Sequence, residues 1–89
     1  MQILFNVGQV VATRNVMEVL EQKEMFQLVN RHSTGDFGDL DKSDTQMNKN
    51  AIKTGEDRIF SAYTIKGKKI YVITEWDRSV TTVMLASDY

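Results

Sequence analysis

The chain has no cysteine and only one histidine, His32, among its 89 residues. Disulfide bonds and cysteine-based zinc sites are therefore excluded, and a site built from several histidines cannot form within one chain. A chain of this length buries only about 60% of the surface that its unfolded form exposes, so its core supplies little stability. Self-association is the remaining way to add stability, and we expect neither a metal nor a cofactor.

Strong charge of one sign is also missing. Eleven basic and twelve acidic residues give a net charge of −1, and no run of five or six like charges occurs. A basic stripe typical of nucleic-acid binders and the high negative charge of a DNA mimic are both absent. Nucleic-acid binding stays a minor third hypothesis, with Trp76 stacking on a base. It would use six scattered basic residues: Arg14, Arg31, Lys66, Lys68, Lys69 and Arg78.

Long apolar runs do not occur either. No segment approaches the ~20 apolar residues that span a bilayer, and the first twelve residues lack the basic start and the cleavage pattern of a signal peptide. We therefore expect a cytoplasmic protein with no membrane contact. Because 42% of the residues are hydrophobic and charges of both signs are mixed, we expect residues 1–89 to form a single globular domain.

The first half of the chain predicts one strand and three helices. Residues 3–12 are rich in β-branched and aromatic side chains, with Gly8 as a bulge or bend. Asn15 and Glu18 match a capping box, which predicts a short helix that ends near Gln22. A second helix follows, because apolar residues recur at helical spacing, with Gly35 as its C-terminal cap. Its apolar stripe consists of Met25, Leu28, Val29 and His32.

The third predicted helix begins with Asp41 or Ser43 as its cap and is closed by Gly55. Its inward-facing residues are expected to be Met47, Ala51 and Ile52. The rest of the chain predicts three antiparallel strands at 58–65, 69–75 and 80–85, with turns at 66–67 and 77–78. The predicted fold class is α+β, in the order β-α-α-α-β-β-β, with the helices packed on one face of a small antiparallel sheet.

Two-residue turns fix which side chains share a face of this sheet. The face expected to meet the helices contains Ile59, Ser61, Tyr63, Ile65, Ile70, Val72, Thr74, Thr81, Val83 and Leu85. The opposite face would show Phe60, Tyr71, Ile73, Val80 and Met84. Because that second face is too apolar to stay open to water, we expect a cover. The sequence leaves four covers open: the first strand, a helix, residues 85–89, or a second copy in a homodimer.

The loop at 35–40 is the first candidate functional segment. His32 lies just before a glycine-bent loop that contains Asp36 and Asp39, and Phe37 lies between the two carboxylates. A carboxylate can raise the pKa of a nearby histidine and orient its ring for acid or base catalysis. Two aspartates could also bind a cation such as magnesium, although the spacing is a weak signal. The structural interpretation is favoured, in which the aspartates bond backbone amides and His32 satisfies one partner at the core edge.

The tip of the last predicted hairpin is the second candidate, with Glu75, Trp76, Asp77 and Arg78. Tryptophan and arginine are enriched in binding hot spots, so the tip is a candidate recognition loop. The structural interpretation is favoured here as well, in which Asp77 and Arg78 form the turn while Glu75 and Arg78 pair across it. Ser79 is not surrounded by the motif of a serine hydrolase, and no phosphate-binding or dinucleotide-binding glycine motif occurs.

Four short blocks of the sequence are distinctive: residues 5–13, Arg-His-x-x-Gly-Asp-Phe-Gly-Asp-Leu at 31–40, Ser-Ala-Tyr at 61–63, and Thr-Glu-x-Asp-Arg-Ser-x-Thr-Thr at 74–82. Together they resemble a group of short bacterial proteins described as plasmid-related or uncharacterised, and the resemblance covers nearly the whole chain. The sequence departs from that pattern at Phe37, where tryptophan is common, and at Arg14, where proline often begins the first helix. The resemblance assigns no chemistry. It implies a setting on plasmids, phages or other mobile elements, where small proteins often inhibit host defences by binding them.

The leading functional hypothesis is a non-enzymatic binding or adaptor module that uses the two loops or the apolar sheet face. An accessory or host-defence-inhibiting role on a mobile element rests on the resemblance alone. The alternative is a small enzyme or ligand-binding protein in which His32, Asp36, Asp39 and Arg78 converge on one pocket, with Arg78 holding an anion. These hypotheses differ in whether the loop at 35–40 and the tip at 75–78 border one cavity.

Overall fold

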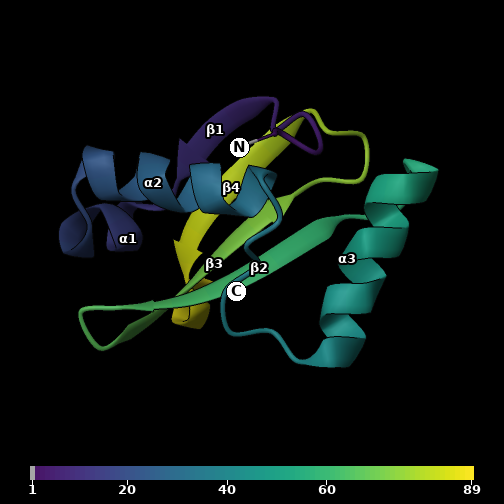
Figure 1. Ribbon diagram of the computed structural model, residues 1–89. Coiled ribbons are helices and arrows are strands. Elements are labelled where there is room, and N and C mark those ends of the chain that lie inside the picture. Colours follow the sequence, from purple (N-terminus) through teal and green to yellow (C-terminus); the bar gives the residue numbers. More distant parts are fainter. Residues whose placement is uncertain (1) are drawn as a thin grey trace.

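The computed structural model describes residues 2–89 as an α+β fold, as expected (Figure 1). The elements follow the predicted order, with a short 3₁₀ turn, η1, at the end. They are β1 (Gln9–Ala12), α1 (Arg14–Val19), α2 (Gln22–Ser33), α3 (Lys42–Thr54), β2 (Ile59–Ile65), β3 (Lys68–Thr74), β4 (Val80–Leu85) and η1 (Ala86–Asp88). No helix within residues 2–89 is both long enough and apolar enough to cross a bilayer.

The sheet has four strands in the order β1-β4-β3-β2. The antiparallel meander of β2, β3 and β4 is confirmed, and its register pairs Ile65 with Lys68 and Thr74 with Thr81. β1 lies beside β4 and runs parallel to it. The sheet is therefore mixed rather than wholly antiparallel. Parallel neighbours need a long connection, and three helices and two strands lie between β1 and β4 in the chain.

The first strand is shorter than residues 3–12, because Gly8 breaks the extended backbone with a φ of +62°. Before this bend, the N–H of Leu4 donates to the carbonyl of Ser33 over 2.8 Å, and the ring of Phe5 packs edge-on against His32. Leu4 and Phe5 thus lie against α2 instead of extending β1. The predicted bend at Gly8 is confirmed.

The face of the sheet that meets the helices is the one predicted. Figure 1 shows α1 and α2 lying together across this face. Their apolar side chains, Val16, Leu20, Leu28 and Val29, form one core cluster with Tyr63, Ile70, Val72 and Val83 of the sheet. Burying these side chains is the main source of stability in a domain of this size.

The helix ends show which local signals are decisive. α2 ends at Ser33, and Gly35 closes it as predicted: its φ of +96° lets the N–H groups of Gly35 and Asp36 donate to the carbonyls of His32 and Arg31, respectively. The capping-box prediction for α1 is wrong. Thr13 is the cap, because its hydroxyl accepts from the N–H of Val16 over 3.3 Å. Asn15 instead donates to Asp88 over 2.7 Å, and α1 ends at Val19, before Gln22.

α3 is capped by Asp41 and closed by Gly55, as predicted, but its inward face is partly different. Ala51 is buried and Ile52 is half-buried, whereas Met47 is 66% exposed, so placing Met47 inside was wrong. Asn48 faces inward instead, because its amide bonds both backbone groups of Phe60, at 2.6 and 3.0 Å. α3 is therefore attached to the outer edge of β2 and stands apart from α1 and α2 (Figure 1).

The second face of the sheet is covered in part by the end of the chain. The ring of Tyr89 packs edge-on against Phe60 and Tyr71, with centroid distances of 6.4 and 5.8 Å. Asp88 holds this segment in place by accepting hydrogen bonds from Thr13 and Asn15. Of the covers left open by the sequence, β1 is excluded because it lies within the sheet. A pocket remains between the second face of the sheet and α3.

Candidate functional site

His32 is fully buried at the centre of a polar network within the core. Its Nδ1 lies 2.5 Å from the hydroxyl of Ser61, and its Nε2 lies 2.9 Å from the hydroxyl of Thr74. The network continues to Thr81, which donates to the carbonyl of Val7 over 2.7 Å. Burial lowers the pKa of His32 to about 3. The imidazole is therefore neutral at physiological pH and serves as the hydrogen-bond partner of the buried hydroxyls of Ser61 and Thr74.

The loop at 35–40 completes the outer edge of β2. The carbonyl of Phe37 accepts from the N–H of Ala62, and the N–H of Asp39 donates to the carbonyl of Ala62. Gly38 lies where a Cβ would be 2.0 Å from that carbonyl oxygen, so only glycine fits. The loop thus pairs backbone groups that the edge strand would otherwise leave unpaired.

The side chains of this loop have structural partners as well. Asp36 accepts from Arg31 over 2.7 Å, and this hydrogen bond holds the pKa of Asp36 below its usual value. Phe37 is buried beside Ala51 and Ile59 in a second, smaller core cluster. Asp39 accepts from the hydroxyl of Thr64 over 2.9 Å.

At the hairpin tip, Arg78 connects α3 to the loop between β3 and β4. Its guanidinium donates to the carbonyls of Ala51, Asp57, Glu75 and Trp76, at distances from 2.7 to 3.2 Å. Asp77 accepts from the backbone and the hydroxyl of Ser79, and these bonds lower the pKa of Asp77. Both side chains shape the turn. The expected pairing of Glu75 with Arg78 occurs through the backbone carbonyl of Glu75 rather than its carboxylate.

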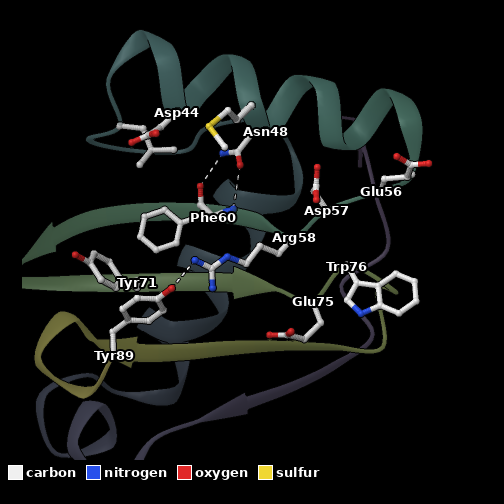
Figure 2. A pocket seen from close by; sticks show the side chains of 13 residues that line it. Asp44, Asn48, Glu56, Asp57, Arg58, Phe60, Tyr71, Glu75, Trp76 and Tyr89 are labelled. Carbon is white, nitrogen blue, oxygen red and sulfur yellow. Dashed lines mark hydrogen bonds between the residues drawn. The ribbon is translucent and has the colours of Figure 1, made fainter.

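Glu75 and Trp76 instead line a pocket of about 840 Å³ between α3 and the second face of the sheet (Figure 2). Its aromatic residues are Phe60, Tyr71, Trp76 and Tyr89, and we call it the aromatic groove. Phe60, Tyr71 and Tyr89 form the floor, with the Phe60 and Tyr71 centroids 4.6 Å apart. Trp76 and Tyr89 remain 65% and 64% exposed, so both rings are available to a ligand.

The rim of the aromatic groove is acidic. Four exposed carboxylates border it: Asp44, Glu56, Asp57 and Glu75. Among the residues that the structure describes, the only basic side chain in the lining is Arg58, which donates to the hydroxyl of Tyr89 and lies 5.3 Å from the centre of the same ring. Within residues 2–89, none of the four carboxylates forms an ion pair. The aromatic groove therefore combines an apolar floor with an excess of negative charge.

The residues proposed for a shared enzyme pocket do not line the aromatic groove. His32, Asp36, Asp39 and Arg78 are absent from its lining, and each is engaged in the core, the sheet edge or the turn. No cluster of three or more His, Asp or Glu side chains in the described part of the chain is placed to hold a metal ion. The enzyme hypothesis depended on these four side chains converging on one pocket, and this geometry does not support that convergence.

Sequence reasoning identified part of the aromatic groove. The alternation of the strands placed Phe60 and Tyr71 on the second face, and the hairpin tip singled out Glu75 and Trp76. Arg58, Tyr89 and three rim carboxylates were missed as site residues. One signal in the sequence could have indicated them. The run Glu-Asp-Arg at 56–58 comes directly before a strand whose alternate residues face outward, so these charges were expected near that outward face.

Comparison with protein-family models, with curated proteins and with solved structures finds no match to this chain.

Proposed function

We propose that this protein is a non-enzymatic binding module that holds a segment of a partner protein in the aromatic groove. The observation that carries this proposal is the exposed pair Trp76 and Tyr89 beside the floor formed by Phe60 and Tyr71. Tryptophan and tyrosine supply much of the binding energy in protein interfaces, because they bury a large area with few rotatable bonds.

The size and openness of the aromatic groove favour a peptide segment. Its volume of about 840 Å³ accommodates several side chains at once. The floor lies on a sheet and one wall is a helix, so two regular elements hold its shape before a ligand arrives (Figure 2). A site formed in this way loses little conformational entropy on binding.

The resemblance to short plasmid-related bacterial proteins supports a more specific role. We propose that the chain acts as an accessory protein of a plasmid, phage or other mobile element, and that its partner is a host protein. Inhibition of a host defence by binding would need no catalytic residues in this chain.

The proposal is tested by selecting binders from a displayed library of random 12-residue peptides. We expect the protein to enrich families of related peptides, which then bind in titrations monitored by fluorescence polarisation. The double variant Trp76→Ala and Tyr89→Ala should weaken binding by more than about tenfold, since hot-spot aromatics contribute about 2 kcal/mol or more. Both side chains are largely exposed, so the variant should fold.

The matched control is Phe26→Ala on α2, which removes an aromatic ring that is 54% exposed and lies outside the aromatic groove. This variant should bind the selected peptides like the wild type. Absence of enrichment, or binding that survives the double substitution, would contradict the proposal. Light scattering could instead show a dimer that persists on dilution and dissociates in the double variant. That result would mean that the aromatic groove binds a second copy of this chain and not a foreign partner.

A further inference from the structure

We infer that the aromatic groove selects a basic segment, in which an arginine or lysine lies close to a large apolar residue. This inference rests on the proposed function and adds the chemical class of the partner. It follows from how charge and aromatic surface are distributed within the aromatic groove.

The charge of the aromatic groove differs from that of the whole chain. Four carboxylates and one guanidinium line it, whereas the whole chain has a net charge of only −1. The guanidinium of Arg58 is engaged with Tyr89, at the floor. A partner that brings positive charge therefore relieves repulsion among the rim carboxylates, and an acidic partner increases it.

The lining separates into two parts that suit two neighbouring side chains of a ligand. At one end, the floor of Phe60, Tyr71 and Tyr89 provides an apolar surface for a large side chain. At the other end, Trp76 lines the aromatic groove together with Glu56 and Glu75, which lie above it and to its left in Figure 2. A cation at this second end would lie near carboxylates and beside an exposed indole ring.

Arginine and lysine suit that second end through both their methylene chain and their charged head. Their methylene chains pack on apolar surface while the charged head stays near water, and their cations are attracted to the faces of aromatic rings. Residues 2–89 contain two contacts of this kind. The guanidinium of Arg31 lies 4.6 Å from the centre of the Tyr63 ring, and that of Arg58 lies 5.3 Å from the centre of the Tyr89 ring.

The same arrangement disfavours nucleic acid as the ligand. A base stacked on Trp76 would bring its phosphates toward Glu56, Asp57 and Glu75, and like charges repel. Arg78, one of the six basic residues that the nucleic-acid hypothesis would use, is occupied by four backbone carbonyls. The favoured macromolecule is a protein with a basic segment.

The test uses the peptides enriched by the wild type from the random library. We expect arginine or lysine within two positions of a large apolar residue in most enriched families. Binding of a representative peptide should weaken about five- to tenfold in Glu75→Lys, because a favourable charge contact becomes a repulsive one. Raising the salt from 50 to 500 mM should also weaken it, since rim charges are screened.

The matched control is Glu18→Lys, which makes the same change in net charge at an exposed position of α1 outside the aromatic groove. Its binding should stay within about twofold of the wild type, since it is far from the contact and screened by salt. Enriched peptides without basic residues, whose binding still depends on Trp76 and Tyr89, would overturn this inference and leave the proposed function standing. Equal losses in both lysine variants would overturn it as well.

Discussion

The hydroxyl oxygen of Thr74 lies 2.9 Å from Nε2 of His32 in the interior of the core. Ser61 closes the other side of the same ring, and no buried side-chain nitrogen or oxygen atom in residues 2–89 lacks a hydrogen-bond partner. A buried polar network adds to stability only when all its members are satisfied. The single histidine therefore links α2 to β2 and β3 through its two ring nitrogens.

Replacing the imidazole should be costly unless its partners are replaced as well. His32→Leu leaves the hydroxyl of Ser61 without its ring partner and should lower the free energy of unfolding by about 2–4 kcal/mol. The triple variant His32→Leu, Ser61→Ala and Thr74→Val should recover part of this loss, because no orphaned polar group remains at the ring. Urea unfolding checks both, and a triple variant no more stable than the single one would contradict the explanation.

The buried histidine should also make stability depend on pH. Burial lowers the pKa of His32 to about 3, whereas an unfolded histidine titrates near 6.5. Between these values the unfolded chain takes up a proton that the native state does not, so stability falls as the pH falls. We expect the free energy of unfolding in urea to decrease by roughly 1.5 kcal/mol between pH 6.5 and 5.0.

The control for this prediction is the triple variant without the histidine, whose stability should be nearly constant over the same range. Carboxylates with lowered pKa values, such as Asp36 and Asp88, also stabilise the native state, but this contribution to stability is lost mainly below pH 5.0, outside the measured range. A slope that is equally steep in the triple variant would show that another group titrates between pH 6.5 and 5.0.

Much of the fold could be predicted because the strands of the meander are joined by tight connections. The two-residue turn at 66–67 fixes which residues of β2 and β3 share a face, and the pairing of Thr74 with Thr81 has the predicted register. The position of α3 could not be predicted in this way. It depends on the amide of Asn48 bonding the backbone of Phe60, and a polar residue on a polar helix gives no periodic signal.

The aromatic groove was only partly predictable for a related reason. Asp44, Arg58, Glu75 and Tyr89 come from four separate segments, and only the packing of α3 and of the last residues brings them together. The sequence singled out the loop at 35–40 because glycine and aspartate suggest a functional turn. The same residues are explained by pairing with the edge of β2, which requires a glycine at Gly38.

Gly38 provides a direct test of that explanation. Gly38→Ala should lower the free energy of unfolding by roughly 3 kcal/mol or more, because φ is +75° and the new Cβ would overlap the carbonyl of Ala62. Gly67→Ala is the matched control, with a φ of +73° and no atom within 4 Å of the new Cβ. It should lose only about 1–2 kcal/mol of backbone strain. Thermal unfolding of both variants measures the difference, and equal losses would contradict the role of the edge pairing.

Arg78 should contribute to stability through geometry rather than charge alone. Arg78→Ala removes hydrogen bonds to the carbonyls of Ala51, Asp57, Glu75 and Trp76, and we expect a loss of roughly 2–3 kcal/mol in urea unfolding. Arg78→Lys should recover less than half of it, because an ammonium group cannot reproduce the planar fork of donors.

Arg14→Ala, at an exposed position of α1, is the control for the loss of one positive charge and should change stability by less than about 0.5 kcal/mol. Because Arg78 joins the end of α3 to the loop that carries Glu75 and Trp76, Arg78→Ala should also weaken binding of the selected peptides. Full rescue of both stability and binding by lysine would mean that only the positive charge at this position matters. Rescue of neither would show that the fork of hydrogen bonds holds the two walls of the aromatic groove together.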